Sequence, residues 1–138
     1  MTDFDNTAII EEFRANGGDV ASRMPGEELL LLHHVGARSG TERVNPLAYL
    51  PAGEGYAIFA SKGGAPQNPD WYHNLLANPY TTVEVGTETV KVKARVAEPA
   101  ERDAIYARQV ERAPQFGDHE RNAAPYRTIP VVVPEPVK

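Results

Sequence analysis

The segment from Val83 to Val96 constrains the fold most strongly, because its apolar residues recur at every second position on both sides of a short polar turn. Val83 and Val85 precede a glycine-containing turn at residues 86–88, and four apolar residues follow it: Val90, Val92, Ala94 and Val96. The alternate positions carry three cations: Lys91, Lys93 and Arg95. A period of two is typical of a strand with one buried face. The segment therefore predicts an antiparallel hairpin with its cationic face in water.

The rest of the chain divides into similarly short elements, separated by glycine, proline and asparagine. Further strands are expected at residues 28–35, 43–50, 56–61 and 128–133, the last of them ended by Pro134. Helices are expected at about residues 7–16, 70–77 and 99–112, and residues 113–126 form either an irregular segment or another short helix. Since helices and strands do not alternate, the order argues against a Rossmann sheet. It favours a small, mainly antiparallel barrel with peripheral helices.

In two of the expected strands, the residue types also predict where the strand lies in the sheet. Four consecutive leucines, Leu29–Leu32, predict a strand that is buried on both faces. Pro46 has no amide hydrogen, so it marks an edge or a bulge in the next strand. No internal repeat or linker-like stretch interrupts the sequence, which predicts a single domain over residues 1–138.

Composition argues against several classes of protein. The 138 residues include no cysteine, so a disulfide framework, a thiolate nucleophile and a cysteine-based metal site are excluded. A formal net charge of −5 argues against a general nucleic-acid binder. No apolar run approaches the roughly 18 residues of a transmembrane helix. The early acidic residues do not resemble a secretion signal, so a cytoplasmic protein is expected.

The cations of the central region are confined to two glycine-containing turns. Between Pro25 and Val90 the basic residues are Arg38, Arg43 and Lys62, against seven acidic ones. The guanidinium group matches phosphate geometry, and successive backbone amides in a turn can form an anion-binding nest. Gly36 and Gly40 are expected to free such amides in the first turn. The pattern favours an anion site where the turns converge, although two ordinary charged hairpin turns would also explain it.

Five blocks of sequence, in this order, resemble the deazaflavin (coenzyme F(420))-dependent nitroreductase family of split β-barrel oxidoreductases. They are IIEEFRANGG, LLL, GARSGTERVNPL, ASKGGAPQNPDWYHNLLANP and RTIPVVV. The resemblance implies an α+β fold, a split β-barrel like that of FMN-binding proteins. It also implies coenzyme F(420), an 8-hydroxy-5-deazaflavin with a phosphodiester and a polyglutamate tail. The expected activity is hydride transfer from the reduced cofactor to a quinone, an activated enone or a nitroaromatic compound.

The resemblance also implies roles for particular residues. The cofactor's phosphate and tail would be held by Arg38, Ser39, Gly40 and Arg43, above a groove lined by Asn45 and Pro46. The deazaflavin ring and its polyol would be approached by Ala60, Ser61, Lys62 and Gly63. The residues expected to close over the cofactor are Asp70, Trp71 and Asn74. Without the resemblance, Trp71 would be interpreted as a plain hydrophobic anchor.

The chain departs from the family pattern beside the first glycine-containing turn and in the segment before the last strand. Ala37 replaces a basic residue that often precedes the serine, and His33-His34 replaces a threonine-rich strand end. Candidates for the acceptor pocket are Tyr126, Phe116 and His33. His33 and His34 are adjacent on a strand and point to opposite faces, so no metal site is expected. No side chain is assigned as a general acid.

Other functions stay open at this stage. A split barrel can also use FMN, and the fold alone does not decide function. A non-catalytic carrier of the cofactor or of a lipid-like ligand would show the same motifs. Membrane contact is expected to be peripheral at most, because the acidic N-terminal helix is better suited to docking on its own barrel. A homodimer is compatible with the sequence, although no residue pattern decides it.

Overall fold

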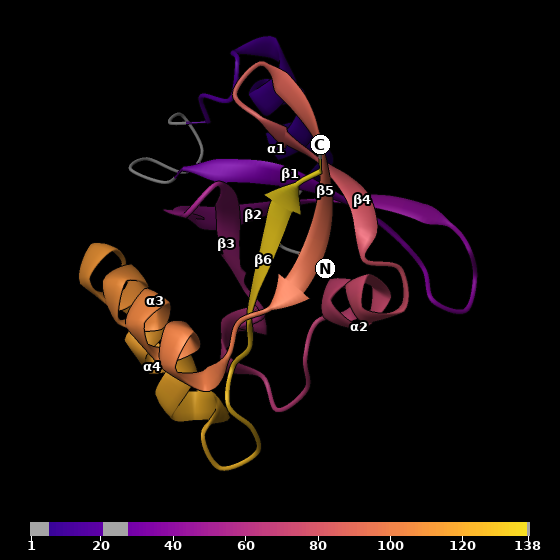
Figure 1. Cartoon of the computed structure of the whole chain (residues 1–138). Helices are drawn as coiled ribbons and strands as arrows, with labels where there is room; N and C mark the ends of the chain where they lie inside the picture. Colours follow the sequence, from indigo (N-terminus) through magenta and orange to yellow (C-terminus); the bar gives the residue numbers. More distant parts are fainter. Residues whose placement is uncertain (1–5, 21–27, 138) are drawn as a thin grey trace.

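A computed structural model describes residues 6–20 and 28–137, and in this part of the chain six antiparallel strands form a closed barrel (Figure 1). The strands are β1 (Leu29–Val35), β2 (Glu42–Ala52), β3 (Gly55–Phe59), β4 (Tyr80–Val85), β5 (Glu88–Val96) and β6 (Val131–Pro136). Their order around the barrel is β1-β2-β3-β6-β5-β4. The helices are α1 (Asn6–Ala15), α2 (Asp70–Ala77), α3 (Pro99–Arg112) and α4 (Gln115–Ala123), with a 3-10 turn, η1, at Lys62–Gly64. The expected α+β barrel is confirmed.

The long strand β2 joins the two halves of the barrel. Its residues 42–48 pair with β1, whereas its residues 49–52 pair with β3. Pro46 lies opposite Leu31 of β1, in the part of β2 that has no pairing to β3. Its missing amide hydrogen therefore costs no ladder bond on that side, and the expectation of an edge position is confirmed.

The four leucines of β1 are buried on both faces, as predicted. Leu30 and Leu32 belong to the cluster inside the barrel, together with Val83 and Val92 of the hairpin. Leu29 and Leu31 point outwards and pack against α1. The apolar side of α1 is thus used on the barrel itself, as the sequence predicted.

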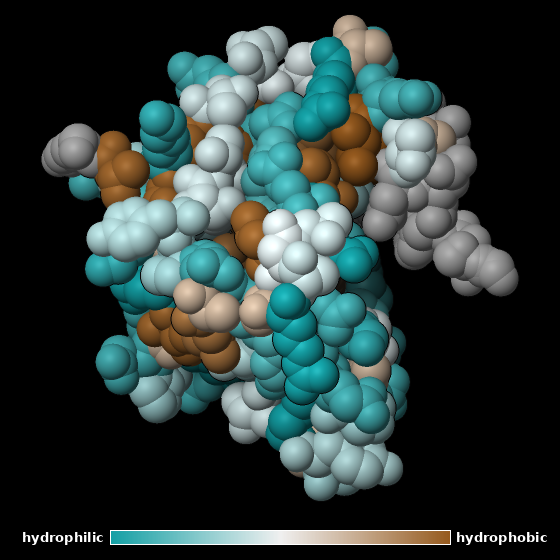
Figure 2. Space-filling view, turned by 90° about the vertical axis from the view of Figure 1, so that its right-hand side faces the viewer, coloured by the Kyte–Doolittle hydropathy of each residue, from teal (hydrophilic) through white to brown (hydrophobic). Residues whose placement is uncertain are grey.

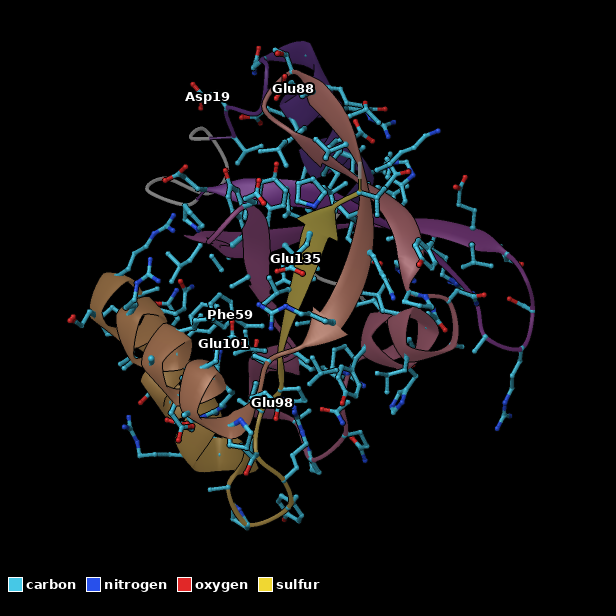
Figure 3. The ribbon with its side chains drawn as sticks, in the orientation of Figure 1. Asp19, Phe59, Glu88, Glu98, Glu101 and Glu135 are labelled. Atoms are coloured by element: carbon cyan, nitrogen blue, oxygen red, sulfur yellow. The ribbon has the colours of Figure 1, made fainter. Side chains whose placement is uncertain are left out.

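A third cluster joins the barrel to α3 and α4. Phe59 of β3 contacts the rings of Tyr106 and Phe116 edge-on, with ring centroids 5.8 and 5.6 Å apart (Figure 3). The hydroxyl of Tyr106 donates a 2.7 Å hydrogen bond to the carbonyl of Phe116. Helix α4 decides the open alternative for residues 113–126 in favour of a short helix.

Two details of the strand prediction are wrong. The last strand does not end at Pro134 but runs from Val131 to Pro136. Pro134 is tolerated because β6 pairs with β3 only through Val131 and Val132, so no ladder bond to β3 needs its amide. Val96 was expected to be buried with the other apolar residues of the hairpin, but it is 41% exposed. It is the last residue of β5, where the strand extends past the barrel interior.

Candidate functional site

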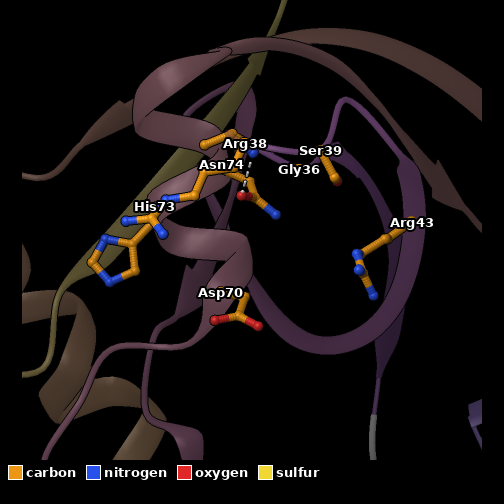
Figure 4. Close-up of a pocket in the computed structure, with 8 residues that line it drawn as sticks. Gly36, Arg38, Ser39, Arg43, Asp70, His73 and Asn74 are labelled. Carbon is orange, nitrogen blue, oxygen red and sulfur yellow. Dashed lines mark hydrogen bonds between the residues drawn. The ribbon is translucent and has the colours of Figure 1, made fainter.

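A cavity lies where the β1–β2 turn meets the first turns of α2 (Figure 4). It measures about 620 Å³ and is open to solvent. The turn contributes Gly36, Ala37, Arg38, Ser39 and Arg43, and α2 contributes Asp70, His73 and Asn74. Figure 2 shows this side of the molecule, where hydrophilic residues predominate and apolar residues form separate patches. The sequence thus predicted five of these lining positions from two segments far apart in the chain: Arg38, Ser39, Arg43, Asp70 and Asn74.

The turn is stabilised by its own backbone. The Gly36 amide donates to the Thr41 carbonyl, and the Gly40 amide donates to the Gly36 carbonyl, both at 2.9 Å. The amides of the two glycines themselves are therefore used inside the turn. Within this turn, the Arg38 and Ser39 amides have no hydrogen-bond acceptor among the described residues, so the turn does leave two amides free, as expected. Gly40 instead supplies a positive φ of 69°, which closes the turn.

A buried hydrogen-bond network fixes the turn to α2. The Ala37 amide donates to Oδ1 of Asn74 at 2.9 Å, which orients the Asn74 carboxamide. Its Nδ2 therefore donates to Nδ1 of His34 at 2.9 Å, and Nε2 of His34 donates to Oδ1 of Asn45 at 2.6 Å. His34 is 2% exposed, and burial lowers its pKa, against the opposing effect of the bond to Asn45. The network requires the neutral imidazole with its proton on Nε2.

The charges around the cavity suit an anion. Arg38 and Arg43 are exposed, and neither forms an ion pair with any described residue. Figure 4 shows Arg43 facing α2 across the cavity, with Asp70 on the first turn of the helix. The negative charge of Asp70 is partly compensated by the positive N-terminal end of the helix dipole, so Asp70 repels a nearby anion less strongly. Two unpaired guanidinium groups beside free amides are the donor set that a phosphodiester or a carboxylate tail requires.

The second glycine-containing turn follows β3 and does not line this cavity. The loop of residues 60–68 leaves β3 beside the middle of β2, whereas the β1–β2 turn lies at the start of β2. Six residues of strand separate these points, roughly 20 Å at about 3.3 Å per residue. Helix α2 lies between them (Figure 1). A ligand that contacts both turns must be elongated, with its anionic part near Arg43 and another part near Lys62.

Three further residues of the expected cofactor site do not line the cavity: Trp71, Asn45 and Pro46. Trp71 is 5% exposed and packs in the barrel interior, so it serves as the hydrophobic anchor of α2. Asn45 reaches the cavity only through His34. Pro46 is half-buried on β2 and does not line the cavity.

The three candidates for an acceptor pocket are not brought together. Phe116 is buried between β3, α3 and α4. Tyr126 is 67% exposed on the segment after α4. His33 lies on the outer face of β1, where its Nε2 is 2.7 Å from Glu84, which also pairs with Arg14 of α1.

Sequence reasoning did not assign His34 or His73 to the site. His73 follows Asp70 by three residues on a helix, so both side chains lie on one face of α2. His34 shares the face of β1 that carries Leu30 and Leu32, and a polar side chain among these leucines was a signal of a buried network. Within residues 6–20 and 28–137, no group of three or more histidine or carboxylate side chains is placed to hold a metal ion. No helix of this part is long and apolar enough to cross a membrane.

Sequence similarity to known proteins extends over nearly the whole chain. Residues 7–136 match the family model of F(420)H(2)-dependent quinone reductases. A protein of that name from Mycobacterium tuberculosis is 37% identical over 125 residues, which cover 88% of this chain and 83% of the relative.

Two solved structures are similar as well. An F(420)H(2)-dependent reductase is 35% identical, with a TM-score of 0.69 over 78% of this chain and 93% of that one. A domain-swapped dimer is 30% identical, with a TM-score of 0.71 over 94% and 96%. These similarities confirm the resemblance drawn from the five sequence blocks, and with it the deazaflavin as the cofactor. The chain belongs to the F(420)H(2)-dependent quinone reductase family.

Proposed function

We propose that the protein transfers a hydride from reduced coenzyme F(420) to an organic acceptor, with a quinone as the first candidate and activated enones and nitroaromatic compounds as others. The observation that carries the proposal is the cavity lined by Arg38 and Arg43, whose guanidinium groups form no ion pair with any residue that the structure describes. In this proposal Arg38, Ser39, Gly40 and Arg43 hold the phosphodiester and the glutamate tail. Residues 61–63 meet the deazaflavin ring, whereas Ala60, which was also expected to approach it, is fully buried beneath them.

The described residues fit such a cofactor. The separation of roughly 20 Å between the two turns suits a ligand with an anionic end and a flat aromatic end. The cofactor, when bound, supplies the hydride, while the protein supplies position and electrostatics. Asn74, held between Ala37 and His34, keeps α2 against the turn, so the two arginines keep their spacing. Holding donor and acceptor face to face lowers the barrier by several kcal/mol.

The proposal is tested by fluorescence titration of the purified protein with coenzyme F(420), beside FMN and FAD. Selective, saturable binding of the deazaflavin is expected. An activity assay with the quinone menadione as acceptor is then expected to show oxidation of the reduced cofactor. The double variant Arg38→Ala/Arg43→Ala loses about 2–4 kcal/mol of cofactor affinity, because each guanidinium makes a charge-assisted hydrogen bond. Preference for FMN would contradict the proposal, and tight deazaflavin binding without turnover of any acceptor would identify a carrier.

We also propose a cytoplasmic protein with at most peripheral membrane contact. Ile9 and Phe13 of α1 are 5% and 1% exposed against the barrel, so the apolar side of this helix is not available to a lipid surface. A related structure is a domain-swapped dimer, which supports a homodimer here as well. Light scattering after size-exclusion chromatography tests the homodimer, and flotation with anionic vesicles tests the membrane contact.

A further inference from the structure

The loop that follows β3 has an unfavourable backbone. Lys62 has a φ of +46°, and among the described residues no other non-glycine residue has a positive φ. Gly63 and Gly64 continue the left-handed conformation with φ values of +65° and +88°. A lysine in this region costs about 1–2 kcal/mol, so the surrounding structure must enforce it.

Arg127 surrounds this loop with hydrogen bonds. Its Nη1 donates to the Ala60 carbonyl at 3.0 Å and to Oδ1 of Asn68 at 2.8 Å. Its Nη2 donates to the Ser61 carbonyl and its Nε to the Ala65 carbonyl, both at 3.0 Å. One side chain therefore joins the beginning and the end of the loop, although Arg127 follows the last of these residues, Asn68, by 59 positions in the chain.

The bonding of Arg127 is unusual for an arginine. The guanidinium is partly buried, burial lowers its pKa, and within the described ranges it meets no carboxylate. Removing a cation from water without a counter-charge is costly. Here that cost is offset by four hydrogen bonds to uncharged oxygens, all of which belong to the same loop.

Helix α4 holds the other side of the loop. A Cβ atom added to Gly64 would lie 2.8 Å from the His119 carbonyl oxygen and 2.9 Å from Cβ of Asn122. Only glycine allows this approach. The loop is therefore fixed between Arg127 and α4, and within residues 60–65 the exposed residues are Lys62 and Gly63.

We propose that Arg127 is a positioning residue for the cofactor: it holds residues 60–65 in the left-handed shape that presents the Lys62 and Gly63 amides and the Lys62 ammonium to the deazaflavin ring. The inference rests on the proposed function, because it assumes that this loop meets the ring. It separates two tasks along the elongated site. Arg38 and Arg43 bind the anionic tail, and Arg127 shapes the part that recognises the ring.

The test compares Arg127→Met and Arg127→Lys with Arg121→Met, which removes an exposed arginine paired with Asp118 on α4. Dissociation constants are measured by fluorescence for coenzyme F(420) and for a tail-less deazaflavin riboside. We expect both Arg127 variants to lose at least tenfold in affinity for both ligands, because an ammonium cannot reach four acceptors as the guanidinium fork does. The Arg121 variant stays within twofold of the wild type. The double variant Arg38→Ala/Arg43→Ala loses affinity only for the ligand with a tail.

Hydrogen exchange of the ligand-free protein tests the loop without any cofactor. The Gly64 amide donates to the Ser61 carbonyl and the Ala65 amide to the Lys62 carbonyl, at 2.8 and 3.1 Å. These two amides are expected to exchange at least tenfold faster in the Arg127 variants, with β1 and β2 unchanged. If Arg127→Met does not fold, Asn68→Ala removes one of the four acceptors and is expected to show the same effects, about threefold in size.

The outcomes separate the two claims. If the wild-type protein binds neither deazaflavin, the proposed function fails and the inference fails with it. If the wild type binds both ligands and the Arg127 variants bind them equally well, only the inference is overturned. Unchanged exchange of the Gly64 and Ala65 amides would overturn it too, because Arg127 would then not hold the loop.

Discussion

Replacement of His34 by phenylalanine tests the buried network between the β1–β2 turn and α2. The ring keeps its approximate size, but two hydrogen bonds are lost, and the Asn74 Nδ2 group and the Asn45 Oδ1 atom lose their partner. Asn74 is 7% exposed, so its Nδ2 group cannot turn to water, whereas half-buried Asn45 has partial access. At about 1–3 kcal/mol for each stranded polar group, His34→Phe lowers the free energy of unfolding by about 2–4 kcal/mol.

Urea denaturation followed by circular dichroism measures this loss as a lower midpoint with an unchanged slope. The matched control is His73→Phe, an exposed histidine of α2 whose replacement changes the unfolding free energy by less than about 0.5 kcal/mol. The reasoning is refuted if the two variants differ by less than about 1 kcal/mol, because the network would then contribute nothing beyond an exposed side chain.

The pH dependence of stability tests independently whether His34 is neutral in the folded protein. The folded-state pKa of His34 lies below its ordinary value of 6.5, so below pH 6.5 the unfolded chain takes up a proton that the folded chain resists. Stability attributable to His34 therefore falls as the pH is lowered through this window, towards the folded-state pKa. His34→Phe lacks this contribution. Between about pH 7.5 and about pH 5.5 the variant is expected to lose less stability than the wild type, and an equal loss would contradict the assignment.

Three further predictions concern other parts of the molecule. Gly63→Ala costs about 1 kcal/mol of stability for its backbone alone, whereas Gly64→Ala costs about 2–4 because its methyl group also meets the backbone of α4; equal midpoints in urea would contradict this. Glu84→Gln loses about 1 kcal/mol near pH 7 by breaking the pair with Arg14. Arg14 lowers the pKa of Glu84, so the wild type loses this advantage as the pH falls below 4.5. Thermal melts of the wild type and of Glu84→Gln should therefore differ near neutral pH and converge at low pH. Burial raises the pKa of Tyr106 to about 12, so absorbance titration should find one late tyrosine that is missing in Tyr106→Phe, which is also about 1–2 kcal/mol less stable.

The sequence by itself determined the strand pattern and one end of the site. Alternation in residues 83–96 and the four leucines of β1 specify which faces are buried, because burial follows the two-residue period of a strand. The glycines and cations of the β1–β2 turn predict an anion site, since their chemistry is local. The five blocks that resemble deazaflavin-dependent reductases also identified the family correctly, because they keep their order along nearly the whole chain.

Only the tertiary structure decided which residues act together. The stagger of β1 and β3 along β2 separates Arg43 from Lys62, and no local pattern encodes a stagger. His34 meets Asn74 across 40 residues of sequence, and Arg127 meets the loop after β3 across about 60. Such contacts depend on barrel closure and on where α2 and α4 pack. A sequence records the hydrogen-bonding capacity of each side chain, but its partner is set by the chain segments that closure of the barrel brings within about 3 Å.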